Sequence, residues 1–400
     1  MSLVYLDELC DSISETFDKN TENIVLINTS DVFNGKVLNH EFVPNKDIKG
    51  QFKKLFQKGD ILYSEIRPAN KHYAFVDFES KNYVASTKLM VLRPKKDKIR
   101  SKYLYYILKN KDVVNFLQGL AESRSGTFPQ ITFSELSTID INLPSLENQD
   151  IIVEIIDNIE LKIENLEKIN RNLQNLIKIL YKEYFESFEL DNVPDDWELV
   201  NIGSIIDIYN GYSYKGAELQ ESDCGMVTIK NFNRDGSFRI DGFKEIVYSN
   251  KIKKHHFINE NDVLISCTDV TQDADIIGNC IMVLDKQNYD ELIMSMDLVK
   301  IESKILEINN FLLASIFKSY NFKKHILGYV NGTTVLHLDK KGIKKFKIAL
   351  PKDLSELKNI SERFELIYAE IQCNQKEINK LTNLRDTLLP KLMSGEIDVS

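Results

Sequence analysis

The chain has 400 residues, of which 43% are hydrophobic and 10% aromatic, enough to fill two or three folded domains and too apolar for a disordered chain. Its net charge of −9 argues, taken alone, against a nucleic-acid partner, so the distribution of charge matters more than its sum. The five cysteines are scattered without a Cys-x-x-Cys pair, which excludes a disulfide framework or zinc ribbon and favours reduced thiols in a cytoplasm. We expect no signal peptide and no membrane span, because the N-terminus lacks a basic and apolar leader and the apolar runs are short.

Residues 1–145 contain short apolar segments bounded by turn residues. The segments ILYSEI (61–66), YAFVDF (73–78) and KLMVLRP (88–94) predict strands. The segment SKYLYYILKNKDVVNFL (101–117) carries an apolar stripe at helical spacing and predicts one helix. We therefore expect a mixed α+β unit whose strand order the sequence does not reveal.

A heptad pattern without proline or glycine occupies 146–190 and predicts a long helix. The a positions are all apolar: Ile152, Ile159, Leu166, Leu173 and Leu180. The d positions are Ile155, Lys162, Ile169, Leu176 and Glu183. Further isoleucines widen the stripe beyond a two-helix seam, so a partner protein could also pack on it; they are Ile151, Ile156, Ile163 and Ile177.

Residues 191–351 repeat the mixed pattern. DVLIS, NCIMVL and DLVKIE predict strands, and INNFLLASIFKSY predicts a helix. The segment DKKGIKKFKI (339–348) alternates as a strand would, with Lys344 or Lys345 facing outward. We expect Trp197 to anchor the start of this unit in its core.

The C-terminal segment, 352–400, contains a second long apolar stripe at three- and four-residue spacing. It predicts a helix that pairs with the first one in an antiparallel coiled coil. Asn374 occupies a seam position in this pattern. Two interpretations remain open for it: a polar residue that fixes the register of the pair, or an exposed residue on the flank.

The two globular units resemble one another at a spacing of about 200–208 residues, a length typical of a duplicated domain. NIVLINTSDVFNGKV is echoed by GMVTIKNFNRDGSF, KGDILYS by ENDVLIS, and SGTFPQITFSELSTIDINLP (125–144) by NGTTVLHLDKKGIKKFKIALP (331–351). We predict an α+β (mixed α/β) protein in which two similar units are separated by two long helices with pseudo-two-fold symmetry. Its expected domains are 1–145, 146–190, 191–351 and 352–400.

The sequence lacks the motifs of an enzyme that would act on nucleotides or DNA. It has no Pro-Pro for an adenine methyltransferase pocket, no dinucleotide-binding glycine fingerprint and no P-loop. Its one histidine pair, His255-His256, would point to opposite faces of a strand, a poor geometry for a metal. We therefore predict no catalytic residues and no metal site, and a surface or DNA-facing role for the pair.

A helix of about 40 residues is roughly 60 Å long, whereas half-sites one DNA turn apart are separated by about 34–36 Å. A two-helix strut could therefore place two DNA-reading units on one face of a duplex. A symmetric scaffold without DNA would have the same outline, so the geometry leaves both interpretations open.

Contacts to phosphates and base edges need cations, amides and hydroxyls at positions that reach a groove. The candidates in the first unit are Arg67, Asn70, Lys71, Lys88, Arg124, Ser125, Thr127 and Gln130. Those in the second unit are Lys230, Asn231, Thr268, Gln272, Asn331, Thr333, Thr334 and His337. The segment 124–127 is equally compatible with a plain tight turn, and the basic runs at 93–102 and 251–256 with solvated loops.

The order of unit, helix, unit, helix resembles the specificity subunit of type I restriction–modification systems. Three stretches carry the likeness: GDILYSEIRPANKHYAFVD (59–77), SGTFPQITFSELSTIDINLPSLENQ (125–149) and LTNLRDTLLPKLMSGEI (381–397). The second unit lacks the Arg-Pro-x-Asn of the first, so individual residues cannot be carried over to it.

The resemblance implies a subunit without a catalytic site, in which each unit is a target-recognition domain for one half of a bipartite site in double-stranded DNA. The helices would set the gap and dock two modification subunits, which bind S-adenosylmethionine and methylate adenine at N6. Some systems add restriction subunits that cleave DNA with ATP. The alternative is a pseudo-symmetric coiled-coil scaffold that does not bind DNA.

Overall fold

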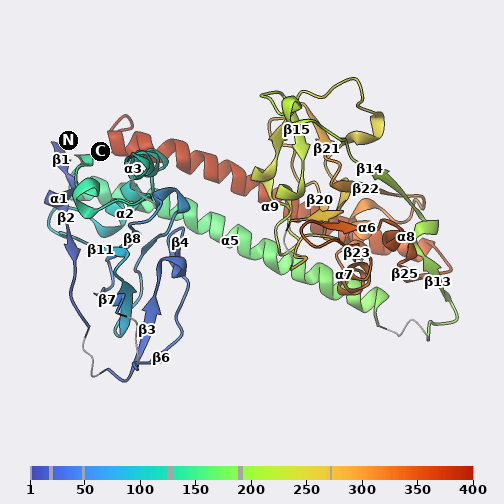
Figure 1. Cartoon of the computed structure of the whole chain (residues 1–400), viewed down its shortest axis with the longest axis horizontal. Helices are drawn as coiled ribbons and strands as arrows, with labels where there is room; N and C mark the ends of the chain where they lie inside the picture. The colour runs from blue at the N-terminus through green and yellow to red at the C-terminus, as the bar shows by residue number, and fades with distance from the viewer. Residues whose placement is uncertain are drawn as a thin grey trace. The chain divides into compact units, whose positions relative to one another are not determined.

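A computed structural model describes residues 2–17, 21–46, 50–123, 129–187, 192–270 and 273–399. The chain forms two compact units, and each combines a globular part with a segment of both long helices (Figure 1). Unit 1 comprises Met1–Ile163 and Lys380–Ser400, and unit 2 comprises Glu164–Asn379. The long helices are α5 (Leu146–Phe185) and α9 (Ser355–Ser394).

Among the described residues, unit 1 contains two four-stranded sheets and two two-stranded ones. The first sheet is antiparallel throughout, in the order β2 (Cys10–Ile13), β11 (Leu89–Pro94), β8 (Ile61–Ser64), β9 (Tyr73–Phe75). The second has the order β6 (Val43–Pro44), β3 (Asn23–Ile27), β10 (Tyr83–Ser86), β7 (Phe52–Leu55), with β3 and β10 parallel. Strands β1 (Ser2–Tyr5) and β12 (Asp140–Leu143) form the third, and both chain ends lie in this unit (Figure 1).

The sheet around β8 is the middle layer of unit 1, because its side chains alternate between two cores. Ile61 and Tyr63 pack with the helices, whereas Leu62 packs with the residues of the second sheet. All four residues of β8 are buried, which explains why Ile61, Leu62 and Tyr63 form a continuous apolar run instead of alternating with polar residues. The predicted strands at 61–66, 73–78 and 88–94 are thereby confirmed.

Unit 2 repeats these sheets in the same order. Its antiparallel sheet is β14 (Ile206–Asn210), β22 (Leu298–Ser303), β18 (Val263–Ser266), β20 (Cys280–Met282). Its second sheet is β16 (Lys244–Glu245), β15 (Cys224–Val227), β21 (Glu291–Met294), β17 (Phe257–Ile258), with β15 and β21 parallel. Strand β13 (Trp197–Asn201) pairs with β25 (Lys347–Pro351), as β1 pairs with β12. The duplication inferred from the sequence is therefore present in the fold.

Two sequence predictions about local structure are wrong. The single helix expected at 101–117 is two helices, α2 (Ser101–Lys109) and α3 (Lys111–Glu122), because Asn110 leaves the helical region and its side chain accepts the N–H of Asp112. Unit 2 has the same break: α6 (Asn310–Phe317) ends before Ser319, whose Oγ accepts the N–H of Phe322 at the start of α7 (Tyr320–Leu327). Residues Lys341–Lys345 form a short helix, α8, where a strand was expected, and Lys344 and Lys345 are both exposed.

The two long helices run antiparallel within each unit. In unit 2, Asn170 of α5 contacts Ile371 and Asn374 of α9, whereas Tyr184, further along α5, contacts Arg363, which precedes them on α9. In unit 1, Glu160 pairs with Arg385, and the earlier Ile152 shares a core with Leu392. The predicted antiparallel pairing is thus present in each unit.

The predicted heptad frame is correct at a and at the d residue Ile155, which packs against the core of unit 1, but it is wrong at the later d positions. The a residues are buried or half-buried. The d residues Ile169 and Leu176 are exposed, and Asn170 and Ile177 are buried in their place. The inward stripe of α5 therefore lies one residue later at these turns, since the helix packs on the globular part of unit 2 as well as on α9.

Asn374 lies in the seam of unit 2 and not on its flank. It is buried, and its Nδ2 donates to Oδ1 of Asn170 at 3.0 Å. Asn170 in turn donates from Nδ2 to the carbonyl of Ile371 at 3.4 Å. A shifted register would leave these amides unpaired in an apolar seam, so the pair favours one alignment of the two helices.

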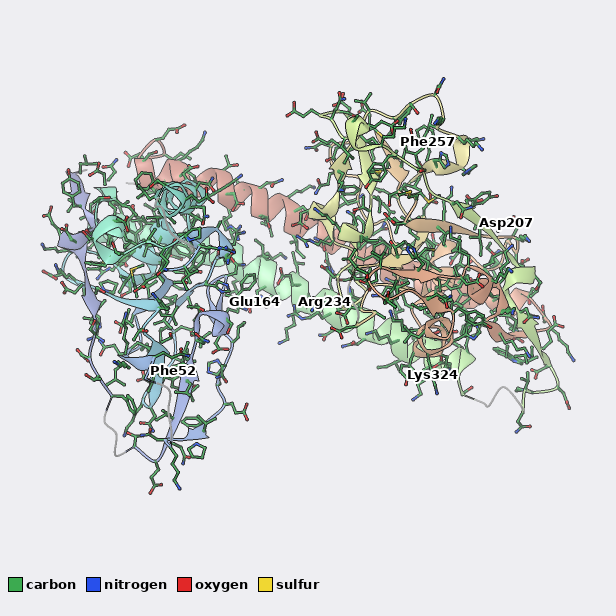
Figure 2. The ribbon with its side chains drawn as sticks, viewed as in Figure 1. Phe52, Glu164, Asp207, Arg234, Phe257 and Lys324 are labelled. Carbon is green, nitrogen blue, oxygen red and sulfur yellow. The ribbon has the colours of Figure 1, made fainter. Side chains whose placement is uncertain are left out.

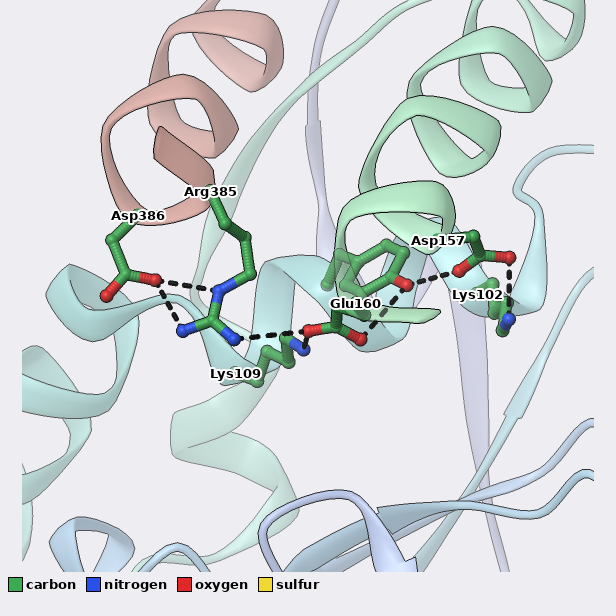
Figure 3. A network of polar contacts seen from close by, with 7 residues as sticks. Lys102, Lys109, Asp157, Glu160, Arg385 and Asp386 are labelled. Carbon is green, nitrogen blue, oxygen red and sulfur yellow. Dashed lines mark hydrogen bonds and ion pairs between the residues drawn. The ribbon is translucent and has the colours of Figure 1, made fainter. Parts of the chain in front are cut away.

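A network of charged and hydroxyl groups fastens α2 of unit 1 to both long helices (Figure 3). Lys102 donates to Asp157 at 2.6 Å, and Tyr106 bonds both Asp157 and Glu160. Lys109 bonds Glu160, which also pairs with Arg385 of α9 at 3.5 Å. Burial is the main reason that the pKa of Lys109 is lowered, while Glu160 opposes that shift.

Candidate nucleic-acid interface

The segment after β8 in unit 1 forms an edge with a distant part of the chain. Ser64 Oγ donates to the carbonyl of Ile66, turning the strand, and Ile66 pairs with Gln130 in an antiparallel bridge. The N–H of Ile131 donates to the carbonyl of Glu65 at 2.8 Å, and the N–H of Glu65 donates to the backbone carbonyl of Lys88. We call residues 64–67, 88 and 129–131 the polar edge of unit 1.

The segment after β18 forms the same arrangement in unit 2. Ser266 Oγ donates to the carbonyl of Thr268, and β19 (Thr268–Asp269) pairs with β24 (Leu336–Leu338). The N–H of Leu338 donates to the backbone carbonyl of Cys267 at 2.9 Å, and the N–H of Cys267 donates to the backbone carbonyl of Asp297 at 2.7 Å. With β23 (Val330–Asn331), residues 266–269, 297 and 330–338 form the polar edge of unit 2.

The two edges are equivalent bond for bond, which identifies matching positions. Ile66 corresponds to Thr268 and Lys88 to Asp297. Gln130 corresponds to His337, since each pairs with the second residue after the turning serine. Matching residues therefore lie at the same place in the fold but differ in chemistry.

In unit 1 the side chains of Lys88 and Gln130 lie together. Lys88 Nζ donates to Gln130 Oε1 at 2.9 Å and lies 3.6 Å from Glu65 Oε2. Beneath them, Lys54 donates from Nζ to the carbonyls of Thr87 and Leu89, on either side of Lys88. Burial lowers the pKa of Lys54, which Glu65 partly opposes. Lys54 thus stabilises the loop that presents Lys88.

Arg67, Asn70 and Lys71 lie on an exposed turn that continues the edge. Arg67 (φ 44°) and Lys71 (φ 57°) both adopt left-handed backbone, which side chains other than glycine rarely adopt. Between them, the 3₁₀ helix η2 (Pro68–Asn70) is held by the bond from Ala69 N–H to Gln118 of α3. Strain of this kind persists where the fold enforces it and concentrates at functional sites.

In unit 2 the predicted residues Thr268, His337 and Asn331 form one cross-strand row. His337 lies opposite Thr268 on one side and Asn331 on the other. Thr268 Oγ1 bonds Oδ1 of Asp297 at 3.0 Å, whereas the side chains of His337 and Asn331 are exposed. Thr333 and Thr334 follow on the turn after Gly332, whose φ of 117° requires glycine. This row presents neutral donors and acceptors to the solvent.

One predicted residue is corrected. Asn231 is fully buried, and its side chain accepts the N–H of Thr228 and donates to the carbonyl of Arg239. It holds a loop of unit 2 and has no group left for DNA. Lys230 is exposed next to it, and none of its contacts within the described ranges joins it to the polar edge. Arg124, Ser125, Thr127 and Gln272 lie outside the described residues.

Two surface features were not predicted from the sequence: the exposed aromatic side chain of Phe33 and the hairpin that carries it. Phe33, 50% exposed, lies on the hairpin of β4 (Val32–Phe33) and β5 (Lys36–Val37), next to His72 at 6.3 Å between ring centres. The N–H of Asn34 donates to the backbone carbonyl of Lys71, and this bond fixes the hairpin to the strained turn. The Asn34-Gly35 dipeptide, typical of tight hairpins, was the available signal.

The histidine pair lies on the 3₁₀ helix η7 (Lys254–His256) and not on the strand that was expected from the sequence. His255 stacks on Tyr209 at 5.9 Å, and His256 is buried with Nδ1 accepting the N–H of Lys253. Burial is the largest cause of the lowered pKa of His256, followed by repulsion from His255 and Lys253. Within the part of the chain that the structure covers, no cluster of three or more His, Cys, Asp or Glu side chains could hold a metal ion.

Comparison with known proteins agrees with the duplicated fold. The model of the type I restriction modification DNA specificity domain matches twice, at residues 4–175 and 194–383. The chain therefore belongs to the family of type I restriction–modification specificity proteins. It is a specificity subunit, the class of subunit in these systems that selects the DNA sequence and does not catalyse.

Individual relatives are similar over different lengths. The HindI specificity subunit of Haemophilus influenzae is 47% identical over 145 residues, which are 36% of this chain and only 32% of that relative. The putative MjaX specificity subunit of Methanocaldococcus jannaschii is 25% identical over 85% of this chain and 79% of its own. The solved S subunit of M. genitalium matches the fold with a TM-score of 0.57, at 17% identity over 100% of this chain and 96% of that one.

No helix in the described ranges is long and apolar enough to cross a membrane. The five cysteines are all free thiols, and only Cys373 is exposed.

Proposed function

We propose that each unit recognises one half of a bipartite site in double-stranded DNA through its polar edge. The supporting observation is that two duplicated units carry equivalent edges whose exposed side chains differ at matching positions, Gln130 against His337. A duplicated fold with different surface groups is what two independent recognition domains for an asymmetric site require.

The two edges would contact DNA in different ways. The edge of unit 1 carries Arg67 and Lys88, and the turn that continues it carries Lys71; these cations suit phosphates and guanine. The edge of unit 2 carries Asn331, His337 and two threonines, which suit base edges and contribute little charge. Unit 1 should therefore supply more of the salt-dependent affinity.

We also propose that the chain acts with two modification subunits that bind S-adenosylmethionine, with restriction subunits where a system has them, in the cytoplasm. The exposed side of α5 in unit 2 is a candidate for docking a modification subunit. Ile169, Leu176 and Ile179 are 45%, 40% and 62% exposed and lie on one side of the helix. A helix that leaves such a stripe uncovered is typical of a protein interface.

Methylation-sensitive sequencing of a host that carries the chain with its modification subunits tests the proposal. The expected result is adenine methylation at one split sequence. Exchange of residues 1–145 for the corresponding unit of another family member should change one half of that sequence only. A change in both halves would contradict independent recognition.

The length of the helices provides a separate test. Removal of one heptad from both α5 and α9 shortens each by about 10 Å, or about three base pairs of duplex. We expect a shorter gap between the half-sites, or loss of methylation. An unaltered gap would show that the helices do not set the spacing.

Equilibrium binding distinguishes this function from that of a scaffold. The complex with modification subunits should be retained on duplex DNA, with affinity that falls steeply as salt rises, because phosphate contacts release counterions. Assembly without any retention on DNA would favour the coiled-coil scaffold.

A further inference from the structure

Unit 2 encloses a cavity of about 510 Å³ that the recognition function does not use. Its floor is apolar and comes from α5, α9 and β20, through Ile177, Ile371 and Met282. Arg234, which is labelled in Figure 2, and Lys178 and Lys182 of α5 also line the cavity. This volume lies in the range of pockets for small organic ligands.

Two hydrogen-bond donors line this cavity without an acceptor. The hydroxyl of Tyr368, whose side chain is 3% exposed, has no hydrogen-bond partner. Lys318 Nζ lies 5.5 Å from the centre of the Tyr368 ring, and no carboxylate or carbonyl of the described residues pairs with it. A buried hydroxyl without a partner is destabilising and rare in folded proteins.

Several other charged groups of the cavity are already paired, whereas Lys178 and Lys182 of α5 are exposed to solvent. Lys323 donates to the carbonyls of Ala274 and Ile277 and to Asn279 Oδ1, at 3.2, 2.6 and 2.7 Å. Glu186 accepts from Asn321 at 2.9 Å, and Arg234 lies 3.4 Å from Asp275. Lys318 and Tyr368 are thus two donors of the cavity that are half-buried or buried and have no partner among the described residues, so they can donate to an anionic oxygen.

We propose that this cavity binds a small amphipathic carboxylate, whose apolar body occupies the floor and whose carboxylate accepts from Lys318 Nζ and Tyr368 Oη. An ammonium and a phenol together match the two oxygens of one carboxylate, and the apolar floor suits an alkyl or aromatic body. The site is independent of the DNA edges, so failure of either proposal leaves the other intact.

Octanoate serves as the probe, with anilinonaphthalene sulfonate as a fluorescent competitor. The single tryptophan of the chain, Trp197, lies 6.0 Å from Phe185, which stacks on the cavity residue Tyr181. Energy transfer from Trp197 to the dye therefore reports binding near this cavity. We expect a saturable signal that octanoate displaces, together with a higher Tm of the full chain in octanoate.

Three variants locate the site. Lys318→Met and Tyr368→Phe each remove one donor with little change in volume, and each should weaken octanoate binding by about tenfold or more. Lys324→Met is the matched control. Lys324 lies on α7, the helix that begins shortly after Lys318, and it is exposed and does not line the cavity (Figure 2), so octanoate binding should be unchanged.

Circular dichroism confirms that each variant is folded before binding is measured. Equal octanoate affinity in all three variants, or dye that octanoate cannot displace, would mean an adventitious binder only and would overturn the proposal. No measurable binding of octanoate to the wild-type chain would overturn it equally.

Discussion

Both units pack on the long helices through an apolar core, but the polar contacts added to that core differ. In unit 1, α2 contacts α5 through ion pairs and hydroxyl bonds to Asp157 and Glu160, and Glu160 also pairs with Arg385 of α9. In unit 2, the core around Tyr181, Phe364 and Tyr368 is accompanied mainly by uncharged hydrogen bonds, such as that from Asn309 to the carbonyl of Ser361, and by the partly exposed ion pair Lys376–Glu260. Duplication preserved the topology, while the interface between each globular part and the helices changed.

This difference has a physical consequence. Apolar burial is insensitive to salt, whereas partly exposed ion pairs are screened by it. The attachment of unit 1 to the helices should therefore weaken at high ionic strength more than that of unit 2. The polar edges also differ in composition, since that of unit 1 includes the cations Arg67 and Lys88, whereas the exposed side chains Asn331, Thr333, Thr334 and His337 of unit 2 include neither Lys nor Arg.

The largest expected effect is at the apolar interface of unit 2. Phe364 is fully buried, and Phe364→Ala should lower the free energy of unfolding by about 3–5 kcal/mol through lost burial and a cavity. Hydrogen exchange on peptides of unit 2 measures this loss in the free energy of unfolding. Leu366→Ala, at a position on the same helix that is 73% exposed, is the control and should have almost no effect. Similar losses in both variants would show that the core contact is not the cause.

The ionic interface of unit 1 should respond next. Glu160→Gln leaves Lys109, only 12% exposed, without its carboxylate, and should destabilise unit 1 by about 3 kcal/mol. The loss should diminish as salt rises, because screening already weakens the pair in the wild type. Glu154→Gln, at an exposed position of α5, is the matched control. A loss independent of salt would contradict the ionic interpretation.

The edges should show smaller and separable effects on DNA binding. Gln130→Ala and His337→Ala should each weaken binding to the cognate site by about 1–3 kcal/mol and relax a different half of it. Lys88→Ala should instead lower the slope of log affinity against log salt by about 0.9, the value for one phosphate contact. Binding assays across a salt series with modification subunits present distinguish these outcomes. If Gln130→Ala and His337→Ala relaxed specificity in the same half of the site, the two edges would not recognise separate halves.

The smallest effect concerns pH and is confined to unit 2. The pKa of His256 in the folded chain lies below its ordinary value of 6.5, so the folded state favours the neutral ring, which accepts the N–H of Lys253. This contribution to stability is complete above pH 6.5, is lost as the pH falls from there toward the lower folded pKa, and changes no further below it.

Urea unfolding between pH 7.5 and 5, followed in unit 2, should show that decline. It should be absent in His256→Asn and retained in His255→Gln. A decline that persists in His256→Asn would assign the pH dependence to another group.

Local sequence patterns predicted the strands at β8, β9 and β11 and the two long helices, because these depend on spacing between near neighbours, but they wrongly predicted a strand where α8 forms. The duplication was visible for the same reason, since Asp60 and Asp262 each cap the turn before a buried strand. The helix breaks at Asn110 and Ser319 were missed because the apolar stripe continues across both residues. Each break depends on the non-helical ψ angle of the one residue that caps the second helix.

The sequence by itself determined that the chain consists of two similar α+β units and two helices that must bury an apolar stripe. Tertiary structure alone decided which side chains are available for function. It buried Asn231, moved the seam of α5 from Ile169 to Asn170, and aligned Gln130 with His337. Such choices depend on pairing between residues far apart in the chain, and a shift of one residue in that pairing turns a side chain from the surface to the core.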